Sequence, residues 1–300
     1  MDILINVLEQ GLIFSIVSLG VYISYKILDF PDLSADGTFP LGAAVTAALI
    51  VKGVNPFIAC IVSFAAGCMG GLVTGILHVK FKITNLLSGI LVMLGLYSIN
   101  LRIMKKSNVP LFGEKTIFSS SIAPLVIIVL FAILSKILLD LFLKTKLGFL
   151  LKAVGDNEQL VSSLGVNKDV IKVIGLMISN GLVALAGSIM AQQGGFADVG
   201  MGMGTVVIGL AAVIMGESLF GKINFIKATT TTILGSILYK GAIALALKFG
   251  LQSADLKLIT AVIVVMALSL NGKSLNFKRK NKAIVGGNGV VNNKKPIQSI

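Results

Sequence analysis

Residues 145–167 read TKLGFLLKAVGDNEQLVSSLGVN, a polar stretch between two long apolar runs. Its first third is rich in Leu and Phe, which gives it an amphipathic character. Gly155 and the polar residues after it are typical of a turn that begins a second helix, with Asp156 or Asn157 as its cap. Gly165 is placed to end that helix. The stretch therefore predicts two short helices that lie flat against a membrane and are offered to another protein.

The rest of the chain is strongly apolar. Of its 300 residues 55% are hydrophobic and 13% are charged, whereas a soluble domain has about 25% charged residues. Apolar runs of about twenty residues can cross roughly 30 Å of hydrocarbon, and a membrane β-barrel would show short alternating segments instead. The sequence therefore predicts an all-α polytopic membrane protein with about 8–10 transmembrane or broken helices.

Nine apolar helical segments are expected. They are 8–28, 40–52, 56–78, 83–104, 121–144, 170–193, 205–217, 223–248 and 256–271. The second and the seventh are short, and a dozen helical residues rise only about 18 Å, too little to cross the bilayer alone. We expect them to be parts of broken elements, whose irregular backbone is tolerated at depth only where protein or a water-filled path satisfies it.

The net charge of +13 is explained by membrane topology, and nucleic acid is not an expected partner. If the loop 144–172 lies in the cytoplasm, 17 of the 26 Lys and Arg residues fall inside, 7 fall outside, and Lys136 and Lys240 fall within helices. This orientation puts the C-terminus inside and the N-terminus outside. The basic loop 102–115 is an exception to this charge distribution, because it falls outside. Residues 273–300 form a basic tail that we expect to lie near anionic lipid and to be disordered.

Two stretches share an ordered pattern. Residues 30–45 read FPDLSADGTFPLGAAV and residues 196–213 read FADVGMGMGTVVIGLAAV. An odd number of segments separates them, so the two halves of the chain are expected to point in opposite directions across the bilayer. Inverted repeats of this kind recur in transporters, with the substrate path near the repeat interface.

These observations divide the chain into a membrane domain, 1–272, and the tail. The membrane domain consists of half one, about 8–104, the linking helix 121–144, the loop 145–169, and half two, about 170–271.

Asp32 and Asp198 occupy matching places in the two repeats. We expect them to cap the broken helices, because a carboxylate ahead of a helix satisfies free N–H groups; ligand binding is the alternative. Gly67, Gly71 and Gly75 recur every four residues, which lets another helix approach closely. Packing within the chain is the first interpretation of this stripe, and a dimer contact is the second.

Four polar residues lie on the segment 83–104 and are candidates for the translocation path: Asn85, Ser88, Tyr97 and Asn100. Polar groups there face the protein interior or a cavity, so hydrogen bonding between helices and contact with substrate both remain open. Lys136 can extend its ammonium group toward the inner surface. Lys240 is a costly charge within an apolar helix, and the sequence does not identify its partner.

No catalytic, cofactor-binding or metal-ligating residues are expected. His78 is the one histidine, no Cys/His pair has zinc spacing, and Gly272-Lys273-Ser274 has Ala267 where a phosphate-binding loop needs glycine. If transport uses ATP, another subunit must bind the ATP.

Several motifs resemble a known family. Leu147-Gly148, LKAVGDNE at 151–158, LGVN at 164–167 and ALAG at 184–187 are similar to the cytoplasmic signature of ATP-binding-cassette importer permeases of the branched-chain amino acid and simple sugar type. Residues 28–44, 83–90 and 96–102 resemble one less characterised branch, whose members are associated with binding lipoproteins and in part with aromatic amino acid uptake. The resemblance covers about residues 8–272.

This resemblance implies a homodimeric permease in the bacterial cytoplasmic membrane, with an ATPase below it and an extracytoplasmic binding lipoprotein above it. It implies that the polar loop forms coupling helices that dock into the ATPase. Carried over by position, the coupling residues are Gly148, Ala153, Gly155, Asp156, Asn157 and Gly165.

We therefore expect the permease subunit of an importer for a small solute, with an aromatic amino acid as one candidate. An ion-coupled secondary transporter is the alternative, and it would need a coupling-ion site that the sequence does not show. A membrane enzyme is disfavoured by the absent catalytic groups.

Overall fold

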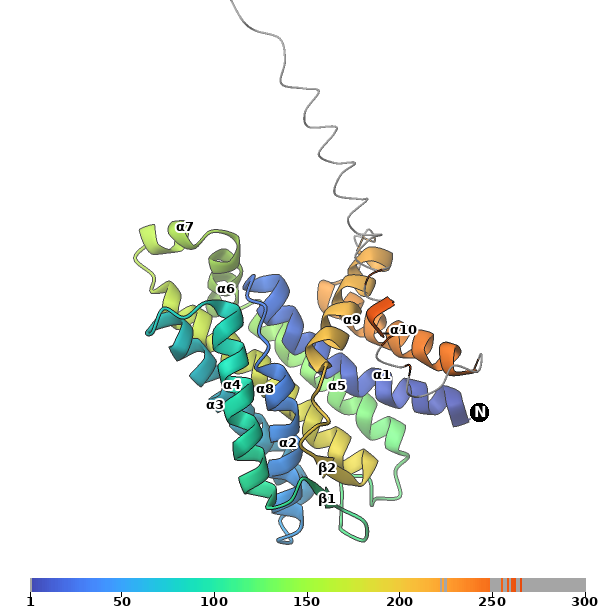
Figure 1. Cartoon of the computed structure of the whole chain (residues 1–300). Coiled ribbons are helices and arrows are strands. Elements are labelled where there is room, and N and C mark those ends of the chain that lie inside the picture. The colour runs from blue at the N-terminus through green and yellow to red at the C-terminus, as the bar shows by residue number, and fades with distance from the viewer. Residues whose placement is uncertain are drawn as a thin grey trace, which may run out of the picture.

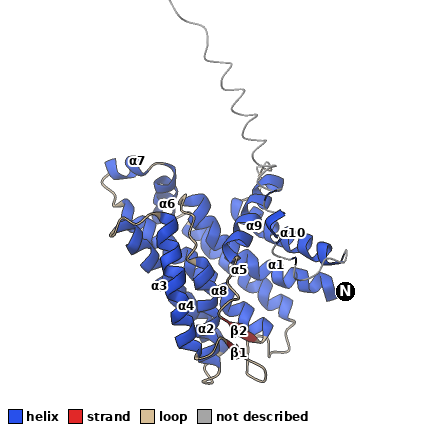
Figure 2. Ribbon diagram, in the orientation of Figure 1, coloured by secondary structure: helices blue, strands red, loops and turns tan. Residues whose placement is uncertain are grey.

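The computed structural model describes residues 2–221, 223, 226–248, 255, 258, 260–262 and 265. The described chain is helical apart from one pair of short strands (Figures 1 and 2). The helices are α1 Asp2–Val21, the π-helix η1 Tyr22–Ile27 that continues it, α2 Ala35–Ile50, α3 Pro56–Val79, α4 Asn85–Met104, α5 Pro124–Phe142, α6 Lys146–Asp156, α7 Glu158–Ser163, α8 Lys168–Gly194, α9 Thr205–Phe220 and α10 Ala228–Lys248. The strands are β1 Asn108–Pro110 and β2 Phe196–Asp198.

Six helices of the described part are long and apolar enough to cross a membrane: α1 with η1, α3, α4, α5, α8 and α10. This confirms the predicted all-α polytopic membrane fold. The short apolar helices α2 and α9 have 16 residues each, longer than the dozen expected. The predicted segment 256–271 lies almost wholly, and the tail 273–300 wholly, outside the described residues.

Helix α2 begins at Ala35, five residues earlier than predicted, and contains Pro40. Proline in a helix leaves the carbonyl four residues earlier without its N–H partner. That carbonyl belongs to Asp36, and it faces Gly202, where a Cβ would overlap it. Gly202 lets the chain approach this first turn of α2 closely. The position of Pro40 in the sequence does not by itself reveal that the helix begins before it.

Helix α8 lies against α1, α2 and α3 and forms the centre of the bundle (Figure 1). Its approach to α3 depends on the glycine stripe, since a Cβ at Gly71 would overlap the Leu176 carbonyl of α8, and one at Gly67 would press on Ala184. The stripe therefore serves packing within the chain.

The helices of the two predicted halves pack across each other. Helices α2 and α3 lie against α8, whereas α9 and α10 lie against α1. Each half thus places its second and third helices on the first helix of the other. Reciprocal packing of this kind is expected of two related halves. Their inverted relation stays a prediction.

The two ends of the bundle differ. Helices α6 and α7 lie at one end, and the strands β1 and β2 lie at the opposite end (Figure 1). The strands pair antiparallel with Val109 opposite Ala197, which ties the loop before α5 to the segment after α8. Neither strand is long enough to show an alternating pattern, so the sequence did not predict this pair.

Candidate coupling and translocation sites

The polar stretch folds into α6 and α7, the two short helices that the sequence predicts. Asn157 caps α7, because its side-chain oxygen accepts the N–H groups of Gln159 and Leu160 at 3.0 and 3.1 Å. Asp156 instead ends α6. Of the two expected caps, Asn157 therefore takes the role.

Helix α7 is closed at its other end by Gly165, whose φ of +74° favours glycine. The Gly165 N–H donates to the Ser162 carbonyl at 3.1 Å, and the Val166 N–H donates to the Val161 carbonyl at 3.3 Å. These two bonds are the Schellman pattern of a helix end. Both ends of α7 are therefore fixed by local hydrogen bonds.

Two glycines seat α6 on the bundle. A Cβ at Gly155 would overlap the Ile27 carbonyl at the end of η1, and a Cβ at Gly148 would overlap the Phe142 carbonyl at the end of α5. Leu151, on the same side of α6, is 1% exposed. The inner face of α6 is thus fitted against the backbone of two membrane helices.

The six predicted coupling residues do not share one face. Gly148 is buried, Ala153 and Gly155 are half-buried, and Asp156, Asn157 and Gly165 are exposed. The first three contribute to seating α6, and the last three form and bound α7.

Large apolar side chains are exposed on these two helices and at the end of α7. Phe149 is 63% exposed, Leu160 is 54% exposed and Leu164 is 68% exposed. All three lie outside the six helices that are long enough to span a membrane. Exposed apolar patches mark sites of interaction with a protein or a membrane. We call α6 and α7 the coupling unit, and these three side chains its apolar face.

Glu158 fastens the coupling unit to the start of α8. Its Oε1 lies 2.5 Å from the Lys172 ammonium, and its Oε2 accepts a hydrogen bond from Lys168 at 2.9 Å. The hydrogen bonds from Lys172 and then Lys168 hold the pKa of Glu158 below its usual range. The carboxylate therefore remains charged and paired at neutral pH.

The π-helix η1 links the coupling unit to α9. Lys26 of η1 donates to both oxygens of Glu217 on α9, at 2.7 and 2.9 Å. Gly155 rests on the last carbonyl of η1, so α6, η1 and α9 are joined by consecutive contacts. The sequence gives no sign of the pair, whose members are 191 residues apart.

The start of α9 is capped by Asp36 from the first turn of α2. The two carboxylate oxygens accept the Gly204 N–H at 3.0 Å, the Val206 N–H at 2.8 Å and the Thr205 hydroxyl at 2.8 Å. A negative charge is favourable at this positive helix end. We call Asp36 and these three partners the start junction, since both short helices begin here. Sequence reasoning missed Asp36.

Asp32 lies just ahead of α2 and is 3% exposed. It accepts the Ser34 N–H at 2.8 Å and an amide N–H of Asn180 on α8 at 2.8 Å. The amide oxygen of Asn180 accepts the Thr38 hydroxyl at 2.7 Å. The carboxylate thus belongs to a closed polar cluster that joins the start of α2 to α8.

Asp198 ends strand β2 and does not contact the first N–H groups of α9. Its carboxylate accepts the Gly200 N–H at 2.7 Å and the Asn108 side-chain amide at 3.2 Å. It therefore holds the turn after β2, and the N–H groups of α9 are held by Asp36.

The four polar residues of α4 lie in different surroundings. Ser88 and Asn100 are buried, and the Asn100 amide donates to the Gly37 carbonyl at 3.2 Å. Tyr97 is 52% exposed, and Asn85 lines a cavity of about 700 Å³ beside Glu158. The structure does not gather them into one site.

Lys136 is paired within the membrane helices. Its ammonium lies 3.0 Å from Asp140 one turn later on α5, and Asp140 also accepts from Lys227 at 3.0 Å and from the Thr229 hydroxyl at 2.6 Å. Its charge is therefore balanced locally. In the part of the chain that the structure describes, no group of three or more His, Cys, Asp or Glu residues is placed to hold a metal ion.

Comparison with known proteins identifies relatives across nearly the whole chain. Residues 3–269 match the family described as "Branched-chain amino acid transport system / permease component". The chain is 55% identical over 282 residues to the tyrosine transport system permease protein of Clostridioides difficile (strain R20291), which covers 94% of this chain and 96% of that protein. It is 25% identical over 280 residues to the ribose import permease protein of Escherichia coli (strain K12), covering 90% of this chain and 85% of that protein.

A solved structure, PsaBC from Streptococcus pneumoniae in complex with Fab, has a similar fold. The TM-score is 0.55 at 16% identity, and the match covers 89% of this chain and 91% of the other. At this identity the likeness concerns the fold alone.

Proposed function

The chain belongs to the branched-chain amino acid transport system permease family, and on that premise we propose that the coupling unit transmits the work of a partner ATPase and that the cargo is an aromatic amino acid. The permease is a multi-pass protein of the cell membrane, and in this family the ATPase is a separate subunit. The family assignment replaces the alternative of an ion-coupled secondary transporter.

The apolar face of the coupling unit carries the first part of the proposal. Phe149, Leu160 and Leu164 expose apolar surface outside the spanning helices, and a docked protein would cover it. The caps at Asn157 and Gly165 order α7 without a partner. A pre-ordered apolar surface loses little conformational entropy on binding, which favours its use as a docking surface.

The seat of α6 supports transmission of force. When the ATPase closes on ATP, a push on the apolar face would reach η1 through the contact between Gly155 and Ile27. The pair of Lys26 with Glu217 would carry it to α9. Packed helices respond to such pushes by shifting between discrete arrangements, as alternating access requires.

Orientation and partners follow from the same proposal. The ATPase is cytoplasmic, so the coupling unit and the C-terminus lie inside and the N-terminus lies outside, as the charge count favours. We propose a homodimer of permeases that receives its cargo from an extracytoplasmic binding lipoprotein. The exposed side of α4 around Tyr97 is our candidate lining of the path, while the buried Ser88 and Asn100 serve helix packing.

The cargo is proposed from the relatives. The tyrosine transport permease shares 55% identity over nearly the full chain, whereas the ribose permease shares 25%. Uptake of labelled tyrosine by cells expressing the whole transporter, with phenylalanine and ribose as competitors, tests this. Competition by ribose with none by phenylalanine would show the cargo to be wrong.

Coupling is tested by the double variant Phe149→Ser with Leu164→Ser. Both side chains are exposed, so the permease should keep its melting temperature while it loses co-purification with the ATPase, and ATP-dependent uptake should fall at least tenfold. Phe112→Ser is the matched control, because Phe112 is 81% exposed in the loop that precedes α5. Undiminished association of the double variant would contradict the coupling proposal.

A further inference from the structure

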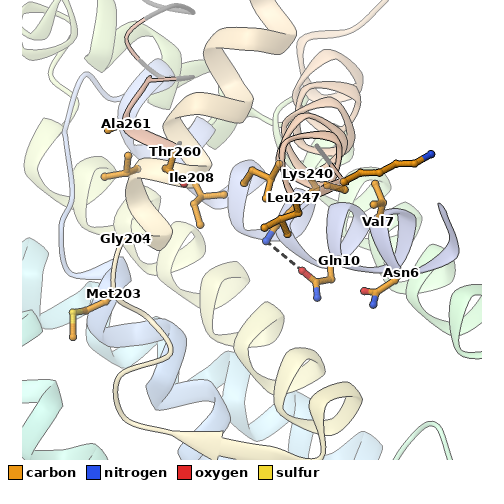
Figure 3. Close-up of a pocket in the computed structure, with 14 residues that line it drawn as sticks. Asn6, Val7, Gln10, Met203, Gly204, Ile208, Lys240, Leu247, Thr260 and Ala261 are labelled. Atoms are coloured by element: carbon orange, nitrogen blue, oxygen red, sulfur yellow. Dashed lines mark hydrogen bonds between the residues drawn. The ribbon is translucent and has the colours of Figure 1, made fainter. Parts of the chain in front are cut away.

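Lys240 is a cation within the membrane helix α10. Its ammonium lies 3.7 Å from the centre of the Phe14 ring and 3.5 Å from the side-chain oxygen of Gln10, both on α1 (Figure 3 shows the latter contact). Among the described residues no carboxylate lies within ion-pair distance of it. An aromatic face and an amide oxygen offset the cost of an intramembrane charge only in part.

The ammonium borders a cavity of about 910 Å³. The cavity lies between α1, the start of α9, the second half of α10 and residues 260–261 (Figure 3). Its walls are mainly aliphatic, and its polar groups include two side-chain amides, Asn6 and Gln10, and a second lysine, Lys248. Cavities of this size, mostly apolar with a few polar groups, are typical of small-molecule sites.

Two carboxylates on the elements that bound the cavity, or in contact with them, are engaged elsewhere. Glu9, next to Gln10, accepts the side-chain amide of Gln193 on α8 at 3.0 Å. Asp36 accepts the N–H groups at the start of α9. The cavity therefore offers positive charge, amides and hydrocarbon, which together suit an organic anion.

We propose that this cavity is a subsite for a small monocarboxylate with an apolar body, whose carboxylate lies on the Lys240 ammonium. A phosphate binds best where several N–H donors converge. The N–H groups at the start of α9 already donate to Asp36. A lysine ammonium supplies one point charge, which can pair with a single carboxylate. The aliphatic walls, formed in part by Ile208 and Leu247, take the body of the solute.

That this monocarboxylate is the amino acid cargo rests on the proposed function. The amide oxygens of Asn6 and Gln10 are then the acceptors for the α-ammonium group. With the coupling unit inside, the start of α1 and the end of α10 place this cavity in the outer half of the membrane. It is a separate site from the path lining proposed on α4, which packs against α2 and α3.

The test measures binding, without ATP and without a binding protein. The full-length permease with its ATPase is placed in phosphatidylcholine nanodiscs, and binding of labelled tyrosine is compared with that of tyramine, which lacks the carboxylate, and of 3-(4-hydroxyphenyl)propionate, which lacks the amine. Tyrosine and the propionate should bind at least tenfold more tightly than tyramine. Lys240→Met should abolish that difference, and Lys240→Arg should restore part of it.

The matched control is Lys52→Met, which removes an exposed lysine outside the cavity and should leave the preference unchanged. Gln10→Leu keeps the Lys240 charge and should weaken the binding of tyrosine more than the binding of the propionate. This variant tests the subsite even if Lys240→Met fails to fold. A Lys240→Met protein that folds and still prefers carboxylates overturns the proposal, as does a Gln10→Leu protein with unchanged affinities.

A lipid phosphate is the competing occupant of Lys240. Repeating the measurement in phosphatidylglycerol nanodiscs should leave tyrosine binding nearly unchanged. If phosphatidylglycerol blocks tyrosine, and native mass spectrometry finds that lipid retained by the wild type and lost from Lys240→Met, the site is a lipid site and the proposal is overturned. Failure of the wild type in ATP-dependent uptake would instead contradict the proposed function, because the binding measurement does not depend on uptake.

Discussion

Two junctions join distant parts of this molecule, and they use opposite means. At the start junction, the Asp36 carboxylate accepts three hydrogen bonds from the first residues of α9. At the seat of the coupling unit, Gly155 rests on the Ile27 carbonyl with no side chain between the two backbones. One junction is polar and directional, and the other is a fit of shapes.

The difference matters for movement. Sliding α9 away from α2 would leave two N–H groups without partners, and each such buried group costs about 1–3 kcal/mol. Between α6 and η1, as the structure describes them, the contact is backbone packing with no hydrogen bond across it. The molecule thus holds its two short helices together by directional hydrogen bonds, whereas a push on α6 reaches η1 through close packing alone.

The largest effect is expected where shape alone makes the contact. Gly155→Leu places a side chain on the Ile27 carbonyl, and overpacking of this kind costs about 1–3 kcal/mol, occasionally more. We expect the coupling unit to leave its seat, with ATP-dependent uptake reduced more than tenfold and Gly155→Ala intermediate. Uptake in proteoliposomes and the melting temperature are the measurements.

Gly241→Leu is the control for that variant. Gly241 is also helical, and among the described residues, its chain neighbours and its own helix backbone aside, no atom lies within 4 Å of the Cβ position there. Its uptake should stay near the wild-type level. If Gly155→Leu transports as well as this control, contact with η1 is irrelevant to coupling and the comparison of the two junctions fails.

Sequence reasoning succeeded where the determinants are local. The cap at Asn157 and the left-handed Gly165 act within one turn of α7, so a short motif predicts them. The need for glycine at 155 was predictable only as part of a motif. Its physical cause, the carbonyl of Ile27, becomes visible when α6 is placed against η1.

The second effect concerns the polar junction. Asp36→Ala removes the acceptor for the N–H groups of Gly204 and Val206, and losing such a cap costs about 2 kcal/mol. We expect a lower melting temperature and reduced uptake. Asp36→Asn keeps one acceptor oxygen and should lose less than half as much stability. Equal losses in the two variants would show that the hydrogen bonds are not what Asp36 contributes.

Asp36 also shows why part of the site was missed. A cap is normally sought just before its own helix, and that rule led to Asp198 for α9. The strand pair turns Asp198 toward Asn108, and the cap is supplied from α2 of the other half. Lys240 was noticed as a costly charge, but its cavity requires α1, α9 and α10 together. Contacts between helices that are far apart in the sequence cannot be predicted from the residue pattern of either helix alone.

The smallest effect is expected within the coupling unit, where neither junction is touched. The pKa of Glu158 is held below its ordinary value of about 4.3, so its pairing contributes stability above that value and loses it as the pH falls through the lower, folded pKa. The side chain is 42% exposed, so solvent screening limits the contribution to less than about 1 kcal/mol.

Hydrogen exchange of α7, corrected for intrinsic rates, should therefore be steady from pH 7 to pH 5 and should lose protection below about pH 4. Glu158→Gln should show slightly lower protection at pH 7 and no further loss on acidification, while uptake at pH 7 changes less than threefold. Lys172→Met, which removes the closest ammonium, should move the loss of protection to higher pH. If Glu158→Gln keeps the full acid response, another group controls the attachment of α7, and the firmness of the coupling unit does not come from this ion pair.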